Sequence, residues 1–402
     1  LAGKGEGERF DFGDANLVKW AKALAPGYLR ISGTKADEVV WGETHDLARW
    51  KEIAEFADKV GLGLWVGLSA GRVERDEQGK WEGGGVRRLL EYLAAEGIGV
   101  EVFELGNEVN AYWLKGLGQV VRGRQLGRDC VAAKKLVNKF FDKAKLVGPA
   151  SAFWPKWGEG WSVLKGFLEV VGVELDGLSW HYYPTQSRRV PVASKRACVG
   201  EVLGGFELDE VKWWAGVVET WRERYVPGVP VWMSETGPAQ GGGEPGWSDR
   251  FGSSLWWADE LGVLASREYA GVVRQCLRGA DYGLVGEDGL PNPDYLVSLA
   301  WKQLMVGEVM EMETDWEEVR VYRCDKGGKM VWWVVNVGDE ACELGLGRGR
   351  QRVVEGESLV GKRVRVNGKV VKPEEYLGFL ELGVVKGRVV VPGKSWGVGE
   401  GV

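Results

Sequence analysis

Hydrophobic residues recur along the first three quarters of the chain in two alternating patterns. Short apolar runs of strand length occupy residues 28–31, 62–68, 100–105, 146–148, 175–180 and 229–233. Between them, apolar residues recur every three or four positions, as in Leu47, Trp50, Ile53 and Ala57, which predicts amphipathic helices. Without a glycine-rich dinucleotide fingerprint, repeated strand–helix units favour a (β/α)8 barrel over a doubly wound sheet. Two weaker runs bring the strand count to the eight that such a barrel needs.

The pattern changes near residue 307. Valine-rich runs with period two follow at residues 319–323, 330–335, 363–366 and 388–391. Asn367-Gly368 directly follows the third run and predicts a type I′ hairpin. We therefore predict an α/β protein with a (β/α)8 TIM barrel at residues 1–306 and a C-terminal β-sandwich at residues 307–402.

Composition removes several classes of function. The chain has 402 residues, of which 45% are hydrophobic, so it can bury a large core. Its net charge of -6 argues against a nucleic-acid partner, and no apolar run reaches the ~20 residues of a membrane span. With only two His and no CxxC pair among five Cys, we expect no metal site. Cys324 and Cys342 could form a disulfide, and the sequence leaves that pairing open.

Candidate chemistry lies where two predicted strands end. Functional residues of a barrel gather at the C-terminal ends of its strands. Asn107 and Glu108 follow the run at 100–105, and Glu235 follows the run at 229–233. A retaining glycosidase needs one protonated and one ionised carboxyl group about 5–5.5 Å apart. Among 58 acidic residues two such acids alone are weak support, but the Asn107 amide could bond the 2-hydroxyl of a sugar.

Six motifs, in this order and spacing, resemble the heparanase-like endo-β-glucuronidases of glycoside hydrolase family 79. The resemblance extends over essentially the whole chain. An Asn-Glu pair alone is shared by a wider group of retaining barrel glycosidases, whereas the ordered set is much narrower. In mammalian members a Tyr stands at the position of Gln240, and a second His accompanies the counterpart of His181. The motifs are residues 26–37, 104–110, 179–183, 232–243, 256–262 and 273–282.

The resemblance implies roles for individual residues. Glu108 would be the general acid/base and Glu235 the nucleophile, and neither a metal nor another cofactor is needed. Backbone amides of Gly241 and Gly242, with Tyr282, would hold the carboxylate of a glucuronate. The other expected substrate-binding residues are Thr34, Asn107, His181, Tyr182, Arg188, Arg189, Gln240 and Gln275.

We therefore expect a retaining endo-β-glucuronidase that acts on heparan sulfate or a related glycosaminoglycan. An exo-β-glucuronidase and a hyaluronan-type endo-β-glucuronidase are the alternatives, and a non-catalytic heparan sulfate-binding protein is a third class. The resemblance also predicts a monomer, secreted or periplasmic, whose leader is absent from this chain.

Overall fold

A computed structural model describes residues 11–39, 41–42, 47–115, 120–159, 162–198, 200–382 and 384–401. The chain forms two compact units. The first, here called the barrel unit, contains Leu1–Tyr182, Trp214–Thr236 and Ala270–Arg274. The second, the sandwich unit, contains Tyr183–Trp213, Gly237–Tyr269 and Gln275–Val402.

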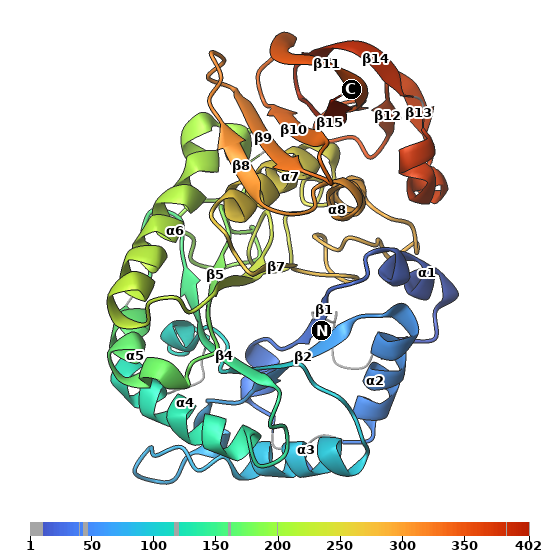
Figure 1. Ribbon diagram of the computed structural model, residues 1–402. Coiled ribbons are helices and arrows are strands. Elements are labelled where there is room, and N and C mark those ends of the chain that lie inside the picture. Colours follow the sequence, from blue (N-terminus) through green and yellow to red (C-terminus); the bar gives the residue numbers. More distant parts are fainter. Residues whose placement is uncertain are drawn as a thin grey trace. The chain divides into compact units, whose positions relative to one another are not determined.

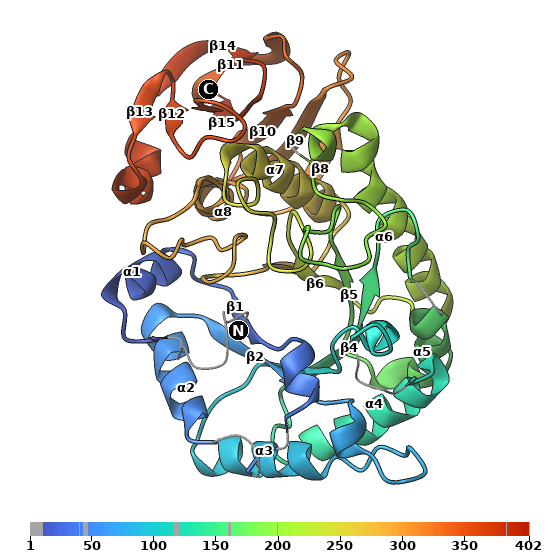
Figure 2. The same ribbon diagram turned by 180° about the vertical axis from the view of Figure 1, so that it is seen from behind.

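The barrel unit holds a parallel sheet in which each strand pairs with the next along the chain (Figure 1). All six clearly predicted strands are present, and a seventh follows them. Helices cover the outer side of the strands, as the view from behind also shows (Figure 2). The strands are β1 Tyr28–Ile31, β2 Gly63–Leu68, β3 Val102–Leu105, β4 Lys145–Phe153, β5 Gly177–Tyr182, β6 Val231–Thr236 and β7 Gly271–Arg274. The helices are α1 Ala15–Ala23, α2 Arg49–Val60, α3 Gly84–Ala95, α4 Gly123–Val137 and α5 Val163–Val171, and α6 Gly205–Tyr225 contributes to both units.

Helix α2 shows how the sequence pattern becomes structure. The predicted stripe residues Trp50, Ile53 and Ala57 are buried, and the helix stops at Gly61. Gly61 has φ 73°, a left-handed conformation that glycine adopts without steric cost and that commonly ends a helix. The next strand, β2, therefore starts directly after the turn.

Aromatic side chains fill the inside of the curved parallel sheet. Tyr28 of β1 lies edge-on to Trp232 of β6 with ring centroids 5.7 Å apart, and Trp65 of β2 packs against both. β1 and β6 are not neighbours in the strand order, so this contact requires the sheet to curl around towards closure. The aromatic layer provides a rigid floor for the polar groups at the strand ends.

The sandwich unit contains antiparallel strands in the order β13-β12-β11-β15-β10-β9-β8, with β14 paired to β11. A break in register between Leu344 and Arg348 divides β11; both segments pair with β14, and the second segment pairs with β15 as well. The elements are β8 Val309–Met312, β9 Val319–Asp325, β10 Met330–Asn336, β11 Cys342–Gly356, β12 Val364–Val366, β13 Lys369–Val371, β14 Val385–Val391 and β15 Ser395–Gly401, with helices α7 Phe251–Ser266 and α8 Pro293–Leu304.

Both faces of β10 are buried. Trp332 and Val334 join a core cluster with residues of β9, β11 and β14, whereas Trp333 donates from Nε1 to the carbonyl of Ala258 in α7 at 3.0 Å. The predicted hairpin is confirmed, because Asn367 and Gly368 connect β12 to β13 and both have positive φ.

The predicted fold class is confirmed as a parallel TIM-like barrel with an antiparallel sheet domain. The described residues contain seven barrel strands rather than eight. The change of pattern near residue 307 coincides with β8, but α7 and α8 group with the antiparallel sheet, so the domain boundary at 306/307 stays a prediction. Cys324 and Cys342 are not joined by a disulfide, so the pairing that the sequence left open is not formed.

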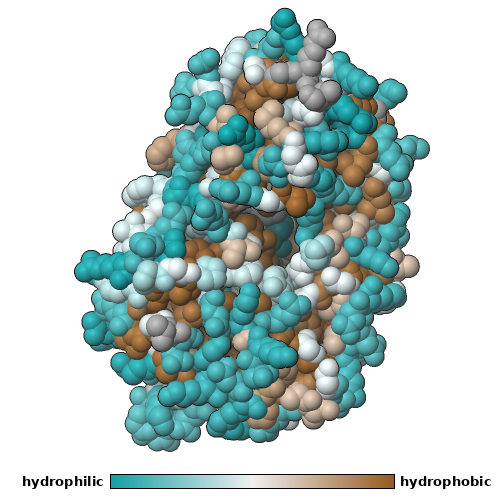
Figure 3. All heavy atoms as spheres, viewed as in Figure 1, coloured by the Kyte–Doolittle hydropathy of each residue, from teal (hydrophilic) through white to brown (hydrophobic). Residues whose placement is uncertain are grey.

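The described residues contain no helix that is both long and apolar enough to cross a membrane. Hydrophilic side chains cover most of the face drawn in Figure 3, and hydrophobic ones form scattered patches among them.

Candidate active site

Glu108 stands at the end of β3 on a tightly constrained turn. Gly106 has φ 81°, and a Cβ there would lie 2.6 Å from Cγ2 of Val109, so both the conformation and the space require glycine. Glu108 itself has φ 53°, which is uncommon for a residue with a side chain. Its N–H donates to the carbonyl of Ala150 at 2.9 Å. Non-glycine residues held in this region cluster at functional sites.

Two side chains fix the turn from either side. Asn110 exchanges two hydrogen bonds with the backbone of Ala152 in β4, at 2.8 and 3.0 Å. Asp37 accepts from the N–H of Asn107 and from the N–H of Ala70, each at 3.0 Å. Burial raises the pKa of Asp37 to about 7, although these backbone donors act in the opposite direction. The turn is thus bonded to β4 on one side and to Asp37, in the short helical turn Thr34–Asp37 after β1, on the other.

Arg30 of β1 connects the second carboxylate, Glu235 of β6, to the inside of the barrel. Its guanidinium donates to Glu235 at 2.9 Å, to Glu104 at 2.8 Å and to the Asn107 side chain at 3.0 Å. Glu104 is fully buried; burial raises its pKa, but Arg30 and His181 outweigh burial, and the net pKa is lowered. Arg30 therefore favours the ionised form of Glu104, and it forms an ion pair with Glu235.

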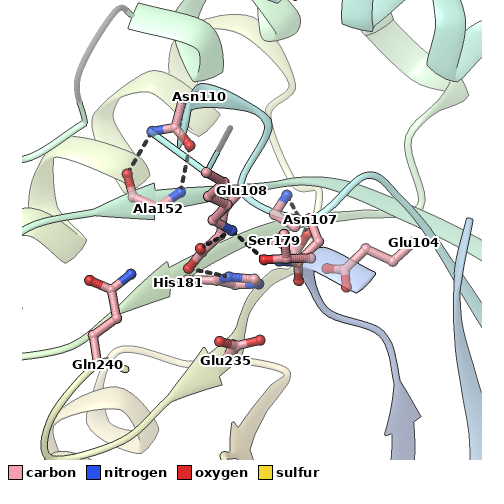
Figure 4. A network of polar contacts seen from close by, with 12 residues as sticks. Glu104, Asn107, Glu108, Asn110, Ala152, Ser179, His181, Glu235 and Gln240 are labelled. Atoms are coloured by element: carbon pink, nitrogen blue, oxygen red, sulfur yellow. Dashed lines mark hydrogen bonds and ion pairs between the residues drawn. The ribbon is translucent and has the colours of Figure 1, made fainter. Parts of the chain in front are cut away.

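His181 contacts Arg30 on one side and Glu108 on the other, and Figure 4 shows its ring beside the Glu108 carboxylate. Its Nε2 is 3.3 Å from a guanidinium nitrogen of Arg30, and its Nδ1 is 3.3 Å from Oε1 of Glu108. A guanidinium can only donate, so Nε2 is the acceptor. In the neutral ring the proton is then on Nδ1, from which His181 donates to Glu108.

Lys115 contacts the other oxygen of Glu108. Its ammonium donates to Oε2 of Glu108 at 2.6 Å and to the hydroxyl of Thr34 at 2.8 Å. Burial raises the pKa of Glu108, but the charge of Lys115 and the hydrogen bond from His181 outweigh it, so the pKa lies well below the ordinary value. In this arrangement Glu108 is ionised.

The two carboxylates and His181 form one compact group. One ligand atom from each of Glu108, His181 and Glu235 lies within 4.8 Å of the others, a spacing that a metal ion could use. However, the Arg30 guanidinium contacts Glu235 and His181, and the Lys115 ammonium contacts Glu108. These cations already balance the carboxylates, so we assign no metal to the group.

The remaining predicted residues lie mostly in the sandwich unit, where several of them come together. Gly241 and Gly242 have φ 88° and 89°, and the carbonyl of Gly242 accepts from the N–H of Asp281 at 2.8 Å. Ser187 donates from its N–H to the carbonyl of Gln240 at 2.9 Å. The ring of Tyr282 stacks on that of Tyr183 with centroids 6.4 Å apart.

Arg188 and Arg189 lie beside this glycine-rich loop, and both have carboxylate partners. Arg188 pairs with Glu244, and Arg189 pairs with Asp281 at 2.5 Å and donates to the carbonyl of Gly243 at 2.9 Å. Their side chains remain 71% and 49% exposed. A polymer anion would therefore have to compete with, or bind beside, existing ion pairs.

Two further predicted site residues, Tyr182 and Gln275, lie in β5 and directly after β7. Tyr182 follows His181 in β5 but is buried and packs near Trp180, with ring centroids 6.3 Å apart, whereas His181 contacts Glu108. Gln275 directly follows the last residue of β7 and is partly exposed.

Sequence reasoning did not identify Arg30, Glu104 and Lys115 as parts of the site. Arg30 and Glu104 each interrupt a short apolar strand with a charge, at Tyr28–Ile31 and Val102–Leu105. A charged side chain inside a buried strand needs a partner, so these two interrupted apolar runs were the sequence signal that could have identified Arg30 and Glu104. Lys115 lies in an irregular segment and carried no comparable signal.

Comparisons with known proteins find matches within one glycosidase family. The model of the glycosyl hydrolase family 79 N-terminal domain matches residues 34–262. Heparanase of Mus musculus is 30% identical over 373 residues, a match that covers 77% of this chain and 67% of the mouse protein. Inactive heparanase-2 of Homo sapiens is also 30% identical, over 64% of this chain and 42% of the human protein.

Solved structures share the fold at much lower identity. The GH51 arabinofuranosidase from Xanthomonas axonopodis pv. citri superposes with a TM-score of 0.71 and 14% identity, covering all of this chain and 93% of the other. At that identity the likeness concerns the fold alone.

Proposed function

Because the chain belongs to glycosyl hydrolase family 79, as a heparanase-like member, we propose that it is a retaining glycosidase that cleaves β-glucuronide linkages. The observation that carries this proposal is the contact group of Glu108, His181 and Glu235, with one oxygen of each carboxylate within 4.8 Å of the other. That spacing suits direct attack on the sugar and leaves little room for the water that an inverting enzyme places between its carboxylates.

In the proposed reaction the two carboxylates have different tasks. Glu235, oriented by its contact with Arg30, attacks the anomeric carbon as a carboxylate and forms a glycosyl ester while the bond to the leaving oxygen breaks. Glu108 gives its proton to that oxygen. It then takes a proton from a water molecule, whose oxygen attacks the anomeric carbon and releases Glu235. Asn107, oriented by Arg30, offers its amide to the 2-hydroxyl of the sugar.

For substrate class we propose a glucuronate-containing glycosaminoglycan, with endo cleavage of heparan sulfate as the first choice. The glycine-rich loop supports a uronate, since Gly241 and Gly242 have positive φ and no side chain, which lets an anion approach the backbone closely. Tyr282 and Gln275 are proposed further contacts to the cleaved sugar. Arg188 and Arg189 are proposed to contact anionic groups of the polymer, in a secreted or periplasmic monomer.

A non-catalytic heparan sulfate-binding protein is the second candidate, because one of the relatives is named inactive heparanase-2. The presence of both Glu108 and Glu235 favours catalysis. The test is turnover of an aryl β-glucuronide and of a defined heparan sulfate oligosaccharide by the wild type and by Glu235→Gln. Loss of turnover in the variant with unchanged oligosaccharide binding supports the hydrolase. An inactive wild type that binds the oligosaccharide supports the binding protein, and a fully active variant refutes the assignment of the nucleophile.

A further inference from the structure

Lys115 occupies a position that conflicts with simple acid catalysis. Its ammonium bridges Oε2 of Glu108 and the hydroxyl of Thr34, and its side chain is 19% exposed whereas that of Glu108 is 5% exposed. Its backbone N–H donates to the carbonyls of Ala111 and Tyr112 at 3.1 and 3.2 Å, so the residue ends a short turn. The Lys115 side chain is thus more accessible than the carboxylate that it contacts.

A general acid must hold a proton when the leaving oxygen departs. Within the barrel unit, Glu108 faces Lys115 and the Nδ1–H of His181, with Glu235 within 4.8 Å. Further charged groups lie behind these. Arg30 contacts Glu235 and His181, Glu104 accepts from Arg30, and Asp37 accepts from the N–H of Asn107. The nearest full charge is the ammonium of Lys115, so the free protein holds Glu108 as a base and not as an acid.

We propose that Lys115 is an anion-responsive positioning residue, and that an anionic group of the substrate must take over its ammonium before Glu108 can act as the acid. This inference rests on the proposed glycosidase function and extends it to the choice of substrate. When a sulfate or carboxylate oxygen binds the ammonium, Glu108 loses its ion pair and takes up one proton from solvent. It then transfers this proton to the glycosidic oxygen.

The contacts of Lys115 suit such an exchange. A lysine ammonium has three donors on a flexible stem, and two of them are directed at Glu108 and at the neutral hydroxyl of Thr34. A substrate anion can therefore replace a weak neutral acceptor first and then compete with Glu108. Neutral sugars offer only hydroxyl groups, which leave the ion pair intact. Anionic substrates would therefore be preferred for two reasons: they bind more tightly, and they allow Glu108 to take up the proton that it needs as the acid.

The test compares the wild type with Lys115→Met, and uses Lys139→Met, at an exposed surface lysine, as the matched control. The substrates are two heparan oligosaccharides that are identical except at the glucosamine on the leaving side, which is N-sulfated in one and N-acetylated in the other. The profile of kcat/KM against pH is measured for each. In the wild type we expect a preference for the N-sulfated substrate of tenfold or more at neutral pH.

In Lys115→Met the limb that falls with rising pH, which reports the acid, should move upward by about 1–3 pH units on the N-acetylated substrate. The preference for sulfate should also fall to less than about threefold. Lys115→Arg should keep the wild-type profile because it keeps the charge, and Lys139→Met should match the wild type throughout. A merely structural Lys115 would lower the activity on both substrates without moving that limb.

Titration of Glu108 by carbon-13 NMR of labelled glutamates, identified with Glu108→Gln, gives a readout that does not need turnover. Lys115→Met should raise the apparent pKa of Glu108, and so should saturating N-sulfoglucosamine on the wild type. An unchanged pKa in both cases overturns the inference even if the wild type cleaves glucuronides. A wild type that cleaves no β-glucuronide at any pH refutes the proposed function, and with it the catalytic meaning of the shift.

Discussion

Replacing Arg30 by Met is the most informative single perturbation of the barrel interior. The Arg30 side chain is 5% exposed and makes ion pairs with Glu104, whose side chain is fully buried, and with Glu235. Met fills similar volume without the charge, so Glu104 is left as an uncompensated anion in the core. Removing one partner of a buried ion pair costs about 3–5 kcal/mol. We expect the free energy of unfolding at pH 7 to fall by that amount.

The loss should depend on pH in a defined direction. The ion pair holds the pKa of Glu104 below its ordinary value in the wild type, so the stability it contributes is lost only as pH falls through that low folded-state pKa. In Arg30→Met the main group that lowers the pKa of Glu104 is gone and only His181 and the hydrogen bond with Ser179 oppose burial, so we expect Glu104 to take up a proton as pH falls from 7. The difference between wild type and variant should therefore shrink between pH 7 and pH 4.5.

Urea unfolding followed by tryptophan fluorescence measures both quantities. Arg388→Met is the matched control, because Arg388 pairs with Glu343 at 2.9 Å but both side chains are more than half exposed. That change should cost at most about 1 kcal/mol. The double variant Arg30→Met/Glu104→Gln should recover part of the stability that Arg30→Met loses. A loss below about 1 kcal/mol at pH 7, or one that does not change with pH, would refute the account of the buried network.

Three further predictions concern the turn that carries the acid. Glu108→Gln should slow hydrolysis of an alkyl β-glucuronide by about 10²–10⁴-fold, because the leaving oxygen no longer receives a proton. Azide needs no general base, so it should restore turnover of 4-nitrophenyl glucuronide by this variant. Absence of rescue in a folded variant would argue against the acid/base role. Gly106→Ala should abolish turnover and lower the melting temperature, because the added Cβ would lie 2.6 Å from the Val109 side chain. The control is Gly79→Ala, which has a similar φ of +80° but open space around it and should keep activity. Equal effects of the two variants would contradict the steric argument. Burial raises the pKa of Asp37 to about 7, so between about pH 4 and 7 Asp37 ionises in the unfolded chain while the folded protein keeps it protonated, and the folded state loses stability as pH rises. Urea unfolding should therefore show the wild type losing stability relative to Asp37→Asn over that range, and parallel profiles would contradict this.

The strands of the barrel were largely predictable because parallel strands covered by helices are nearly continuous apolar runs. β2 and β5 follow their predicted runs within a few residues. β7, Gly271–Arg274, has only four residues and gave a weak signal. The grouping of α7 with the antiparallel sheet could not be predicted, since it depends on contacts such as that of Trp333 with Ala258 and not on the helix's own pattern.

The candidate site was predictable only as far as its motifs. Asn107, Glu108 and Glu235 stand at strand ends in a family pattern, and the contact group containing both glutamates agrees with that reading. The cations that set their charge were not predictable, because Arg30 lies 205 residues from Glu235 and nothing in the spacing pairs them. Lys115 is only seven residues from Glu108, yet it lies outside any helix or strand, where the spacing along the sequence does not determine which way a side chain points.

The central claim is that Glu235 attacks the sugar directly while Glu108 serves as acid and then base. Proton NMR of the first product formed from a β-glucuronide tests it most directly. The account predicts that the β-anomer of glucuronic acid appears first and then mutarotates. Initial release of the α-anomer would show a single inverting displacement by water and would contradict the assignment of both carboxylates.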